Sequence, residues 1–277
     1  MAHYNLGLYE KSMPHKLSIA QKLATTKEIG FDFLEVSIDE TDEKLSRLKW
    51  NTSQRAEVTT AINEFGIPIK TMCLSGHRKF PLGSADAATR ASSLEIMDRA
   101  IDLACCWGVR IIQLAGYDVY YEDSNEKTLA NFYENLSKSV DLAAKAGVML
   151  AFETMETPFM DTVAKAVACV NKINSPYLHV YPDLGNLTNA ASIYGHDVTH
   201  DIAAGRGHIS AMHLKETKPG HYRDVPYGTG HVDFAAGIVA AQALGVNCFV
   251  GEFWDDGDYR PQMVHACRFL RGFFEDF

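Results

Sequence analysis

The amino-acid sequence repeats one pattern about eight times, in which an apolar run of strand length is followed by a helical stretch and then by the next apolar run. A glycine stands at five of the joints between helix and strand, where a left-handed helix cap and a short turn are needed. These joints are at Gly30, Gly66, Gly108, Gly147 and Gly245. Strands that alternate with helices along a whole chain form a parallel sheet. About eight units in 277 residues favour a closed α/β structure, the (β/α)8 TIM barrel, over an open doubly wound sheet.

The predicted elements follow the apolar periodicity and its glycine and proline breaks. Strands are predicted over residues 4–10, 31–38, 67–74, 109–115, 148–153, 177–181, 209–214 and 247–253. Helices are predicted over residues 18–28, 52–65, 88–107, 126–146, 162–173, 197–204, 234–244 and 261–274, and residues 39–50 are predicted to form a charged loop. Because no linker or low-complexity segment interrupts the pattern, we expect residues 1–277 to form a single domain.

The composition sets limits on partners and location. Hydrophobic residues make up 47% of the chain and charged residues 22%, a soluble globular balance with enough apolar material for a core. The formal net charge of -9 argues against nucleic acid or an anionic membrane as the main partner, because both require a basic surface. No secretory signal is visible, and no apolar stretch approaches the roughly 20 residues of a membrane helix. The six cysteines form no CxxC pair, so we expect a cytoplasmic protein with reduced cysteines in its core.

Four consecutive predicted strands, the fifth to the eighth, each lead into a side chain that binds cations. These side chains are Glu153, Asp183, His213 and Glu252. In a barrel, side chains at the carboxyl ends of the strands surround one mouth, where catalysis takes place. Any one of the three acids alone would fit a solvated strand end or a helix N-cap. Crowded carboxylates, however, repel one another, and a bound dication relieves that repulsion. Three oxygen donors with one imidazole suit a divalent ion such as Mn, Zn, Co or Mg, so the pattern predicts a metal enzyme.

Sequence signatures of other chemistries are absent. The chain has no P-loop, no HExxH and no GxSxG nucleophile elbow. The segment Gly228-Thr229-Gly230 does not open a strand-to-helix dinucleotide turn. We therefore expect one divalent metal ion and no organic cofactor.

Further polar residues follow the same strand ends and form the pool of predicted substrate-binding side chains. The loop after the third strand contains a histidine and two cations, although an ordinary solvated basic loop would look the same. Two residues lie three positions after predicted metal ligands, and two cations follow the seventh strand. The predicted substrate-binding residues are His77, Glu156, Asn186, Lys215 and Arg223.

Several segments spread along the chain resemble one known family. They are LGLYEK (6–11), DETD (39–42), HRKFPLGS (77–84), QLAGYDVYY (113–121), YPDLGNL (181–187) and VPYGTG (225–230). With its strand-end acids, the chain resembles the xylose-isomerase-like barrels, and among them the L-ribulose-5-phosphate 3-epimerases of L-ascorbate utilisation. The resemblance implies a metal held by Glu153, Asp183, His213 and Glu252. It also implies an isomerase of carbohydrate metabolism that interconverts L-xylulose 5-phosphate and L-ribulose 5-phosphate.

The chain departs from the related free-ketose 3-epimerases at two places. Those enzymes carry a histidine three residues after the metal-binding aspartate, where this chain has Asn186. They also place an arginine shortly after the metal-binding histidine, where this chain has residues 215–219, Lys-Glu-Thr-Lys-Pro. These departures disfavour a free sugar. The candidate phosphate contacts are His77, Arg78, Lys79, Lys215, Lys218 and Arg223.

Epimerisation at C3 of a ketose removes the proton next to the C2 carbonyl and returns one to the opposite face. The resulting enediolate requires a Lewis acid, and the proton transfer requires a base on each face of the sugar. Glu153 and Glu252 follow the fifth and the eighth strand, the two outer members of the four adjacent strands that carry the candidate ligands. We therefore predict that they are the catalytic pair.

Three alternatives share parts of this chemistry. An aldose–ketose isomerase would use the same metal but move the proton between C1 and C2. A barrel endonuclease for abasic DNA would need more histidines at strand ends and a basic groove. A sugar-phosphate binder without catalysis would bind but not turn over. The aromatic loop at 117–121 fits either a lining or lid of the pocket or an interface patch, and exposed aromatic loops make a homodimer the expected assembly.

Overall fold

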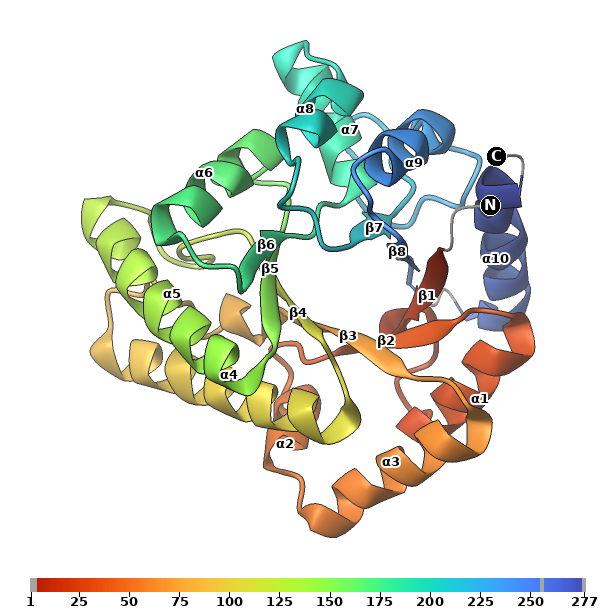
Figure 1. Cartoon of the computed structure of the whole chain (residues 1–277), viewed down its shortest axis with the longest axis horizontal. Coiled ribbons are helices and arrows are strands. Elements are labelled where there is room, and N and C mark those ends of the chain that lie inside the picture. Colours follow the sequence, from red (N-terminus) through yellow and green to blue (C-terminus); the bar gives the residue numbers. More distant parts are fainter. Residues whose placement is uncertain (1–3, 255–256, 276–277) are drawn as a thin grey trace.

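The computed structural model describes residues 4–254 and 257–275, and within them eight strands form one sheet with helices around it (Figure 1). The paired strands are parallel and follow the order β6-β5-β4-β3-β2-β1-β8-β7. Isolated parallel bridges from Val180 to Ile209 and from Asp183 to His213 join the two ends of this order and close the barrel. The predicted TIM barrel is thus confirmed. The strands are β1 Asn5–Tyr9, β2 Phe33–Ser37, β3 Ile69–Leu74, β4 Ile111–Ala115, β5 Met149–Glu153, β6 Leu178–Val180, β7 Met212–Leu214 and β8 Cys248–Gly251.

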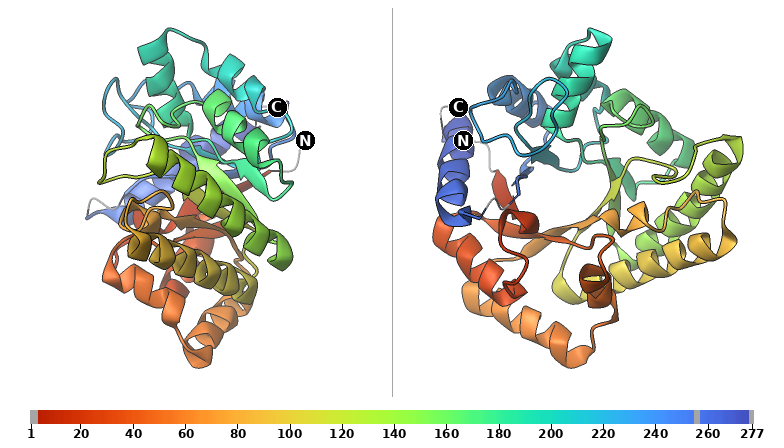
Figure 2. Two further views of the ribbon diagram at one scale, coloured as in Figure 1. Left: turned by 90° about the vertical axis from the view of Figure 1, so that its left-hand side faces the viewer. Right: turned by 180° about the vertical axis from the view of Figure 1, so that it is seen from behind.

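The helices lie outside the strands, as the views from the side and from behind show (Figure 2). Those that connect or follow successive strands are α1 Ile19–Ile29, α3 Thr52–Phe65, α4 Ala87–Trp107, α5 Glu126–Ala146, α6 Val163–Ile173, α8 Val198–Ala204, α9 Phe234–Gln242 and α10 Tyr259–Glu275. Each corresponds to a predicted helix, and the five predicted glycine joints have positive φ angles of 65° to 100°. Across the described ranges, no helix is both long and apolar enough to cross a membrane.

The stretch 39–50, predicted as a charged loop, contains helical structure instead. Helix α2 (Asp42–Ser46) and the 3-10 turn η2 (Arg47–Lys49) occupy most of it. The hydroxyl of Thr41 accepts a hydrogen bond from the backbone N–H of Lys44 and caps α2. An N-cap threonine followed by acidic residues is a helix start signal, and the high charge of the segment concealed it.

A second unpredicted helix, α7 (Leu184–Tyr194), follows β6. Its first turn contains a glycine and an asparagine, which are poor helix formers. The Asp183 side chain caps this turn by accepting the backbone N–H of Asn186 at 2.6 Å. A Cβ at Gly185 would lie 2.7 Å from the Lys215 carbonyl oxygen, so only glycine permits this close approach. Tertiary packing and the cap, not helix propensity, therefore set α7.

Two layers of apolar packing hold the barrel together. The larger one fills the space between the strands and the surrounding helices. A smaller cluster, which includes Tyr9, Phe33, Tyr181 and Val250, is made of the alternate strand residues that fill the inside of the barrel. A Cβ at Gly7 would lie 2.4 Å from the Phe33 ring, so the absence of a side chain at position 7 gives that ring its place. The barrel interior is packed, and this packing supports the side chains at its mouth from below.

A buried ion cluster centred on Glu10 fixes the segment that follows β1. Lys22 Nζ lies 2.9 Å from Glu10 Oε1, and Arg47 Nη1 lies 2.8 Å from Oε2. Lys44 also pairs with Glu10, and the backbone N–H of Ser37 donates to Oε2 at 2.8 Å. Burial alone would raise the pKa of Glu10, but the three cations outweigh it and hold the pKa well below its usual range. The carboxylate is thus the counter-charge of three buried cations.

Replacing Glu10 by glutamine is expected to destabilise the fold by about 3–5 kcal/mol at pH 7, because three cations would be left without their counter-charge. A carboxylate with a depressed folded-state pKa stabilises the fold above its unfolded pKa and loses that effect as the pH falls. The difference in unfolding free energy between the wild type and E10Q, measured in urea, should therefore become smaller in acid. Glu134→Gln, which breaks an exposed pair with Lys138, is the matched control and should leave the unfolding midpoint almost unchanged. An E10Q midpoint equal to that of the wild type would contradict this account.

Candidate active site and metal centre

The four predicted metal ligands converge at the mouth of the barrel. One ligand atom from each of Glu153, Asp183, His213 and Glu252 lies within 4.8 Å of the corresponding atoms of the others. All four residues are buried. Glu153 ends β5 and His213 lies in β7, while Asp183 and Glu252 stand just beyond β6 and β8. The structure therefore brings together side chains that are up to about a hundred positions apart in the chain.

Backbone hydrogen bonds between neighbouring strands set the positions of these side chains. The N–H of His213 donates to the Pro182 carbonyl oxygen at 2.9 Å, which places β7 directly beside Asp183. The N–H of Glu252 donates to the Leu214 carbonyl oxygen at 3.0 Å, just beyond the end of β8. The strand pairing thus extends to the residues that carry the site, so their backbone is as well fixed as the barrel itself.

His213 stands between carboxylates on both sides of its ring. Its Nδ1 lies 3.0 Å from Glu252 Oε2 and 3.6 Å from Glu153 Oε1, and its Nε2 lies 2.6 Å from Glu35 Oε1. The amide nitrogen of Gln113 lies 3.2 Å from both ring nitrogens. Burial by itself lowers the pKa of His213, but the charges of Glu35 and Glu252 outweigh it and raise the pKa well above its usual range. The imidazole therefore lies in a strongly negative environment.

Asp183 has a buried carboxylate oxygen that lacks a hydrogen-bond partner. Its Oδ2 is buried and has no hydrogen bond, although Lys215 Nζ lies 3.2 Å away in an ion pair. Burial raises the pKa of Asp183 well above its usual range, against the attraction of Lys215 and with the repulsion of Glu252. A buried carboxylate oxygen without a hydrogen bond is costly, and coordination to a cation would satisfy it.

The two glutamates differ in their electrostatic surroundings. Burial and the charge of Glu252 raise the pKa of Glu153, against the hydrogen bond from His213. Burial would also raise the pKa of Glu252, but the charges of Lys215 and His213 outweigh it, and the pKa lies below its usual range. Two carboxyl groups whose pKa values are driven apart are a frequent arrangement for an acid and base pair.

The buried ammonium of Lys215 lies inside this cluster. It contacts Asp183 Oδ2 and also Glu252 Oε2, the latter at 3.5 Å. Burial lowers its pKa, but the charges of Asp183 and Glu252 outweigh that effect and raise the pKa above its usual range. Lys215 therefore stays charged and places a cation beside two of the predicted ligands.

Three more predicted substrate-binding residues lie close to the cluster. Asn186 Nδ2 donates to the Thr154 carbonyl oxygen at 2.7 Å, which leaves its buried Oδ1 without a partner. Arg223 Nη2 lies 3.3 Å from Glu156 Oε1, and its guanidinium lies 5.6 Å from the ring centroid of Trp254. These contacts join the loops after β5, β7 and β8.

His77 is not brought together with them. Its Nε2 lies 3.2 Å from the carbonyl oxygen of Ser93 in α4, so the ring is directed towards a helix outside the barrel. Burial lowers the pKa of His77 to about 4, and the ring is uncharged at neutral pH. A charged contact with a phosphate from this residue is therefore unfavourable, and its part in substrate binding stays a prediction.

Sequence reasoning missed two residues that contact His213, namely Glu35 and Gln113. Both lie in the middle of strands, β2 and β4, and both are fully or nearly fully buried. Ligands at a barrel mouth are expected from strand ends, so residues in the middle of a strand were not predicted. The available signal was the alternation of β2, in which Phe33, Glu35 and Ser37 share the face that points into the barrel.

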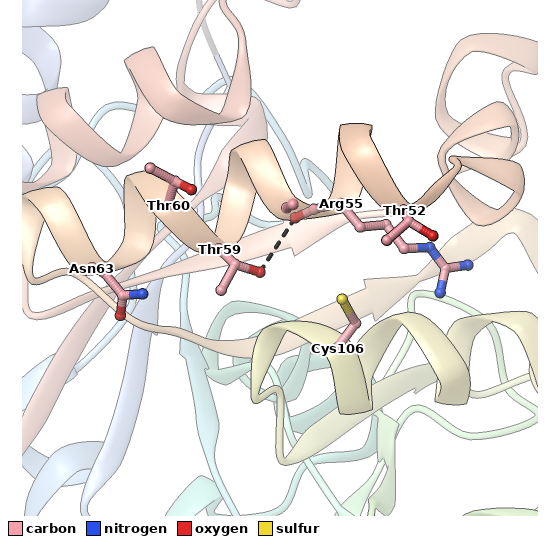
Figure 3. Close-up of a pocket in the computed structure, with 7 residues that line it drawn as sticks. Thr52, Arg55, Thr59, Thr60, Asn63 and Cys106 are labelled. Atoms are coloured by element: carbon pink, nitrogen blue, oxygen red, sulfur yellow. Dashed lines mark hydrogen bonds between the residues drawn. The ribbon is translucent and has the colours of Figure 1, made fainter.

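A separate groove of about 410 Å³ lies between α3 and α4 on the outside of the molecule (Figure 3). Polar side chains line it, among them Thr52, Thr59 and Asn63, together with Arg55 and Cys106. None of its lining residues belongs to the strand ends at the barrel mouth. It is therefore unconnected with the cluster described above.

This fold and this ring of strand-end side chains define a xylose isomerase-like TIM barrel, and residues 23–273 match the family model of that description. Two similar relatives are L-ribulose-5-phosphate 3-epimerases UlaE. The protein of Shigella flexneri is 44% identical over 269 residues, which cover 96% of this chain and 93% of that protein. The protein of Salmonella heidelberg (strain SL476) is 48% identical over 229 residues, or 83% of this chain and 79% of that protein. The chain belongs to the L-ribulose-5-phosphate 3-epimerase family.

Solved structures of sugar epimerases share the fold. A D-tagatose 3-epimerase-like protein superposes with a TM-score of 0.82 at 15% identity, covering 98% of this chain and 97% of its own. An L-ribulose 3-epimerase superposes with a TM-score of 0.77 at 21% identity, covering 99% of this chain and 95% of its own. At these identities the likeness establishes the barrel and no more.

Proposed function

We propose that the chain is a metal-dependent isomerase that interconverts L-xylulose 5-phosphate and L-ribulose 5-phosphate by inverting C3. The observation that carries the proposal is the buried cluster of Glu153, Asp183, His213 and Glu252 at the barrel mouth. The chain is 44–48% identical to L-ribulose-5-phosphate 3-epimerases, which supports the choice of sugar phosphate. The acidic net charge is compatible with an anionic small substrate, because a few local cations are enough to bind one phosphate.

The residues present fit one divalent ion. The cluster offers three carboxylates and one imidazole, and the Asp183 Oδ2 atom lacks a hydrogen bond. When bound, the ion would act as a Lewis acid that polarises the C2 carbonyl and stabilises the enediolate. Mn, Zn, Co and Mg all accept this donor set, and we propose one of them.

Proton transfer is assigned to the two glutamates. Glu153 and Glu252 lie beside the same nitrogen of His213, at 3.6 and 3.0 Å, and come from strands on opposite sides of β6 and β7. One carboxylate removes the C3 proton, and the other delivers a proton to the opposite face. Asp183 and His213 make no proton transfer in this scheme and mainly position the cation.

Substrate recognition is assigned to the polar groups around the cluster. The free Oδ1 of Asn186 is a hydrogen-bond acceptor suited to a sugar hydroxyl. The ammonium of Lys215 is placed to stabilise negative charge on the sugar oxygens. Arg223 and Glu156, which pair at 3.3 Å between the loops after β7 and β5, are proposed to contact the more distant part of the substrate.

Incubation with L-xylulose 5-phosphate, with and without a chelator, tests the function directly. We expect L-ribulose 5-phosphate as the product and loss of turnover when the chelator is present. Formation of an aldose phosphate would identify an aldose–ketose isomerase instead, because the proton would then have moved between C1 and C2. Binding without any turnover in the presence of metal would contradict both.

A further inference from the structure

The Glu35 carboxylate lies in the barrel interior, where side chains from β3, from β7 and from the residues just after β6 bind it. Its Oε1 lies 2.6 Å from His213 Nε2. Its Oε2 accepts hydrogen bonds from Thr71 Oγ1 at 2.6 Å and from the Tyr181 hydroxyl at 2.9 Å. All four residues are fully buried. Both oxygens of Glu35 are therefore committed, and the carboxylate has a single orientation.

The contact between Glu35 and His213 decides where the ring carries its hydrogen. An ionised carboxylate only accepts hydrogen bonds, so the nitrogen facing it, Nε2, must be the donor. A histidine that binds a metal ion is neutral and carries one hydrogen, so with that hydrogen on Nε2 the lone pair of Nδ1 is available to the ion. Nδ1 is the nitrogen that faces Glu252 and Glu153. Only an unprotonated nitrogen binds a metal ion.

The other neighbours of His213 fix the plane of the ring but not its tautomer. The Gln113 amide nitrogen is 3.2 Å from both ring nitrogens and does not distinguish them. The Tyr181 ring packs edge-on against the imidazole, with the two centroids 4.9 Å apart. Two carboxylates distinguish the ring nitrogens, Glu35 at Nε2 (2.6 Å) and Glu252 at Nδ1 (3.0 Å). Glu252 is itself a predicted ligand whose oxygens would turn to a bound ion, so Glu35 is the carboxylate left to hold the hydrogen on Nε2 in the metal-bound site.

We propose that Glu35 is a positioning residue that fixes the tautomer and orientation of His213, so that Nδ1 is the nitrogen presented to the divalent ion. This inference rests on the metal centre of the proposed function, but not on the identity of the sugar. Carboxylates in this relation to a ligating histidine set the direction of the lone pair and raise the basicity of the ligand. Glu35 is not one of the four candidate ligands, so it would act through His213.

Glu35→Gln tests the role because it keeps the size of the side chain and adds a donor. The hydroxyls of Thr71 and Tyr181 donate towards Oε2, so they should bind the amide oxygen and turn the NH2 group towards His213. Nε2 would then have to accept a hydrogen bond, and the ring hydrogen would move to Nδ1, where it blocks the metal. We expect the zinc affinity of E35Q, measured by competition with a chelating dye, to fall about 10–100-fold.

Asp201→Asn is the matched control, because Asp201 is a buried carboxylate that caps α6 and lies outside the cluster. It should lower the melting temperature without changing zinc affinity. In the zinc-loaded wild type, 15N spectra should show the His213 hydrogen on Nε2, and this measurement requires no variant. A hydrogen on Nδ1, or an E35Q variant with wild-type zinc affinity, would overturn the assignment of Glu35 alone. A wild type that binds no divalent ion would overturn the metal centre as well, and neither measurement depends on the sugar.

Discussion

Replacing Glu153 or Glu252 by glutamine is expected to slow interconversion of the two epimers by a factor of about 10²–10⁴, and with it the exchange with deuterated water of the C3 proton that faces the replaced glutamate. The amide has nearly the shape of the carboxylate but cannot take up a proton at neutral pH. Because a base is needed on each face of the sugar, the loss of either glutamate should stop the full cycle. The measurement is deuterium incorporation at C3 by NMR, starting separately from L-ribulose 5-phosphate and L-xylulose 5-phosphate.

Both glutamates are also predicted metal ligands, so the metal content of each variant has to be measured alongside exchange. Asp183→Asn is the appropriate comparison, since Asp183 is a predicted ligand without a part in proton transfer. At saturating metal, D183N should keep more exchange than E153Q or E252Q. Because each base serves one face, each variant should lose exchange from the epimer whose C3 proton faces the missing base, and neither should form the other epimer. A glutamate variant that exchanged the C3 proton of both epimers at the wild-type rate would contradict the assignment of the two bases.

The barrel was predictable because each of its units repeats the same local rules. Three local signals predict the same alternation of strands and helices: apolar runs of strand length, amphipathic stretches, and glycine joints such as Gly66 and Gly147. Short αβ turns and parallel strands then leave few topologies for eight units. The strand-end ligands were predictable for the same reason, because in a closed parallel barrel all carboxyl ends of strands meet at one mouth.

The parts that escaped prediction depend on contacts between distant segments. Helix α7 begins with Leu184 and Gly185, and although Asp183 caps it locally, its first turn fits there because the chain at Lys215 packs closely against its glycine. Glu35 interacts with His213 across the barrel, 178 positions away in sequence. The packing against Gly185 and the contact between Glu35 and His213 are not visible from local propensity. This explains why the clustering of the four strand-end side chains could be predicted, whereas the residues that support them inside the barrel could not.

Removal of the divalent ion is expected to lower turnover by about 10³-fold or more. Lewis-acid stabilisation is worth several kcal/mol, and each 1.36 kcal/mol corresponds to a tenfold change in rate. Chelation should also lower the melting temperature, because Glu153, Asp183 and Glu252 would be left as crowded carboxylates. A ligand present at about 1,000 times its Kd stabilises the folded state by about 4 kcal/mol, which sets the scale of that shift.

Reconstitution separates a specific metal effect from damage by the chelator. Affinity for sites of this kind rises from Mn to Co and remains high for Zn, whereas Mg keeps its water ligands and binds weakly, so Mg should restore activity only at higher concentration. Asp183→Asn removes a predicted ligand oxygen, and it should raise the metal concentration needed for half-maximal activity. E10Q, whose change lies in the ion cluster beyond β1, should lower stability without altering that concentration. Full activity of the wild type after the ion has been removed and its absence verified would exclude the Lewis-acid role, because the same residues would then be catalysing the reaction without it.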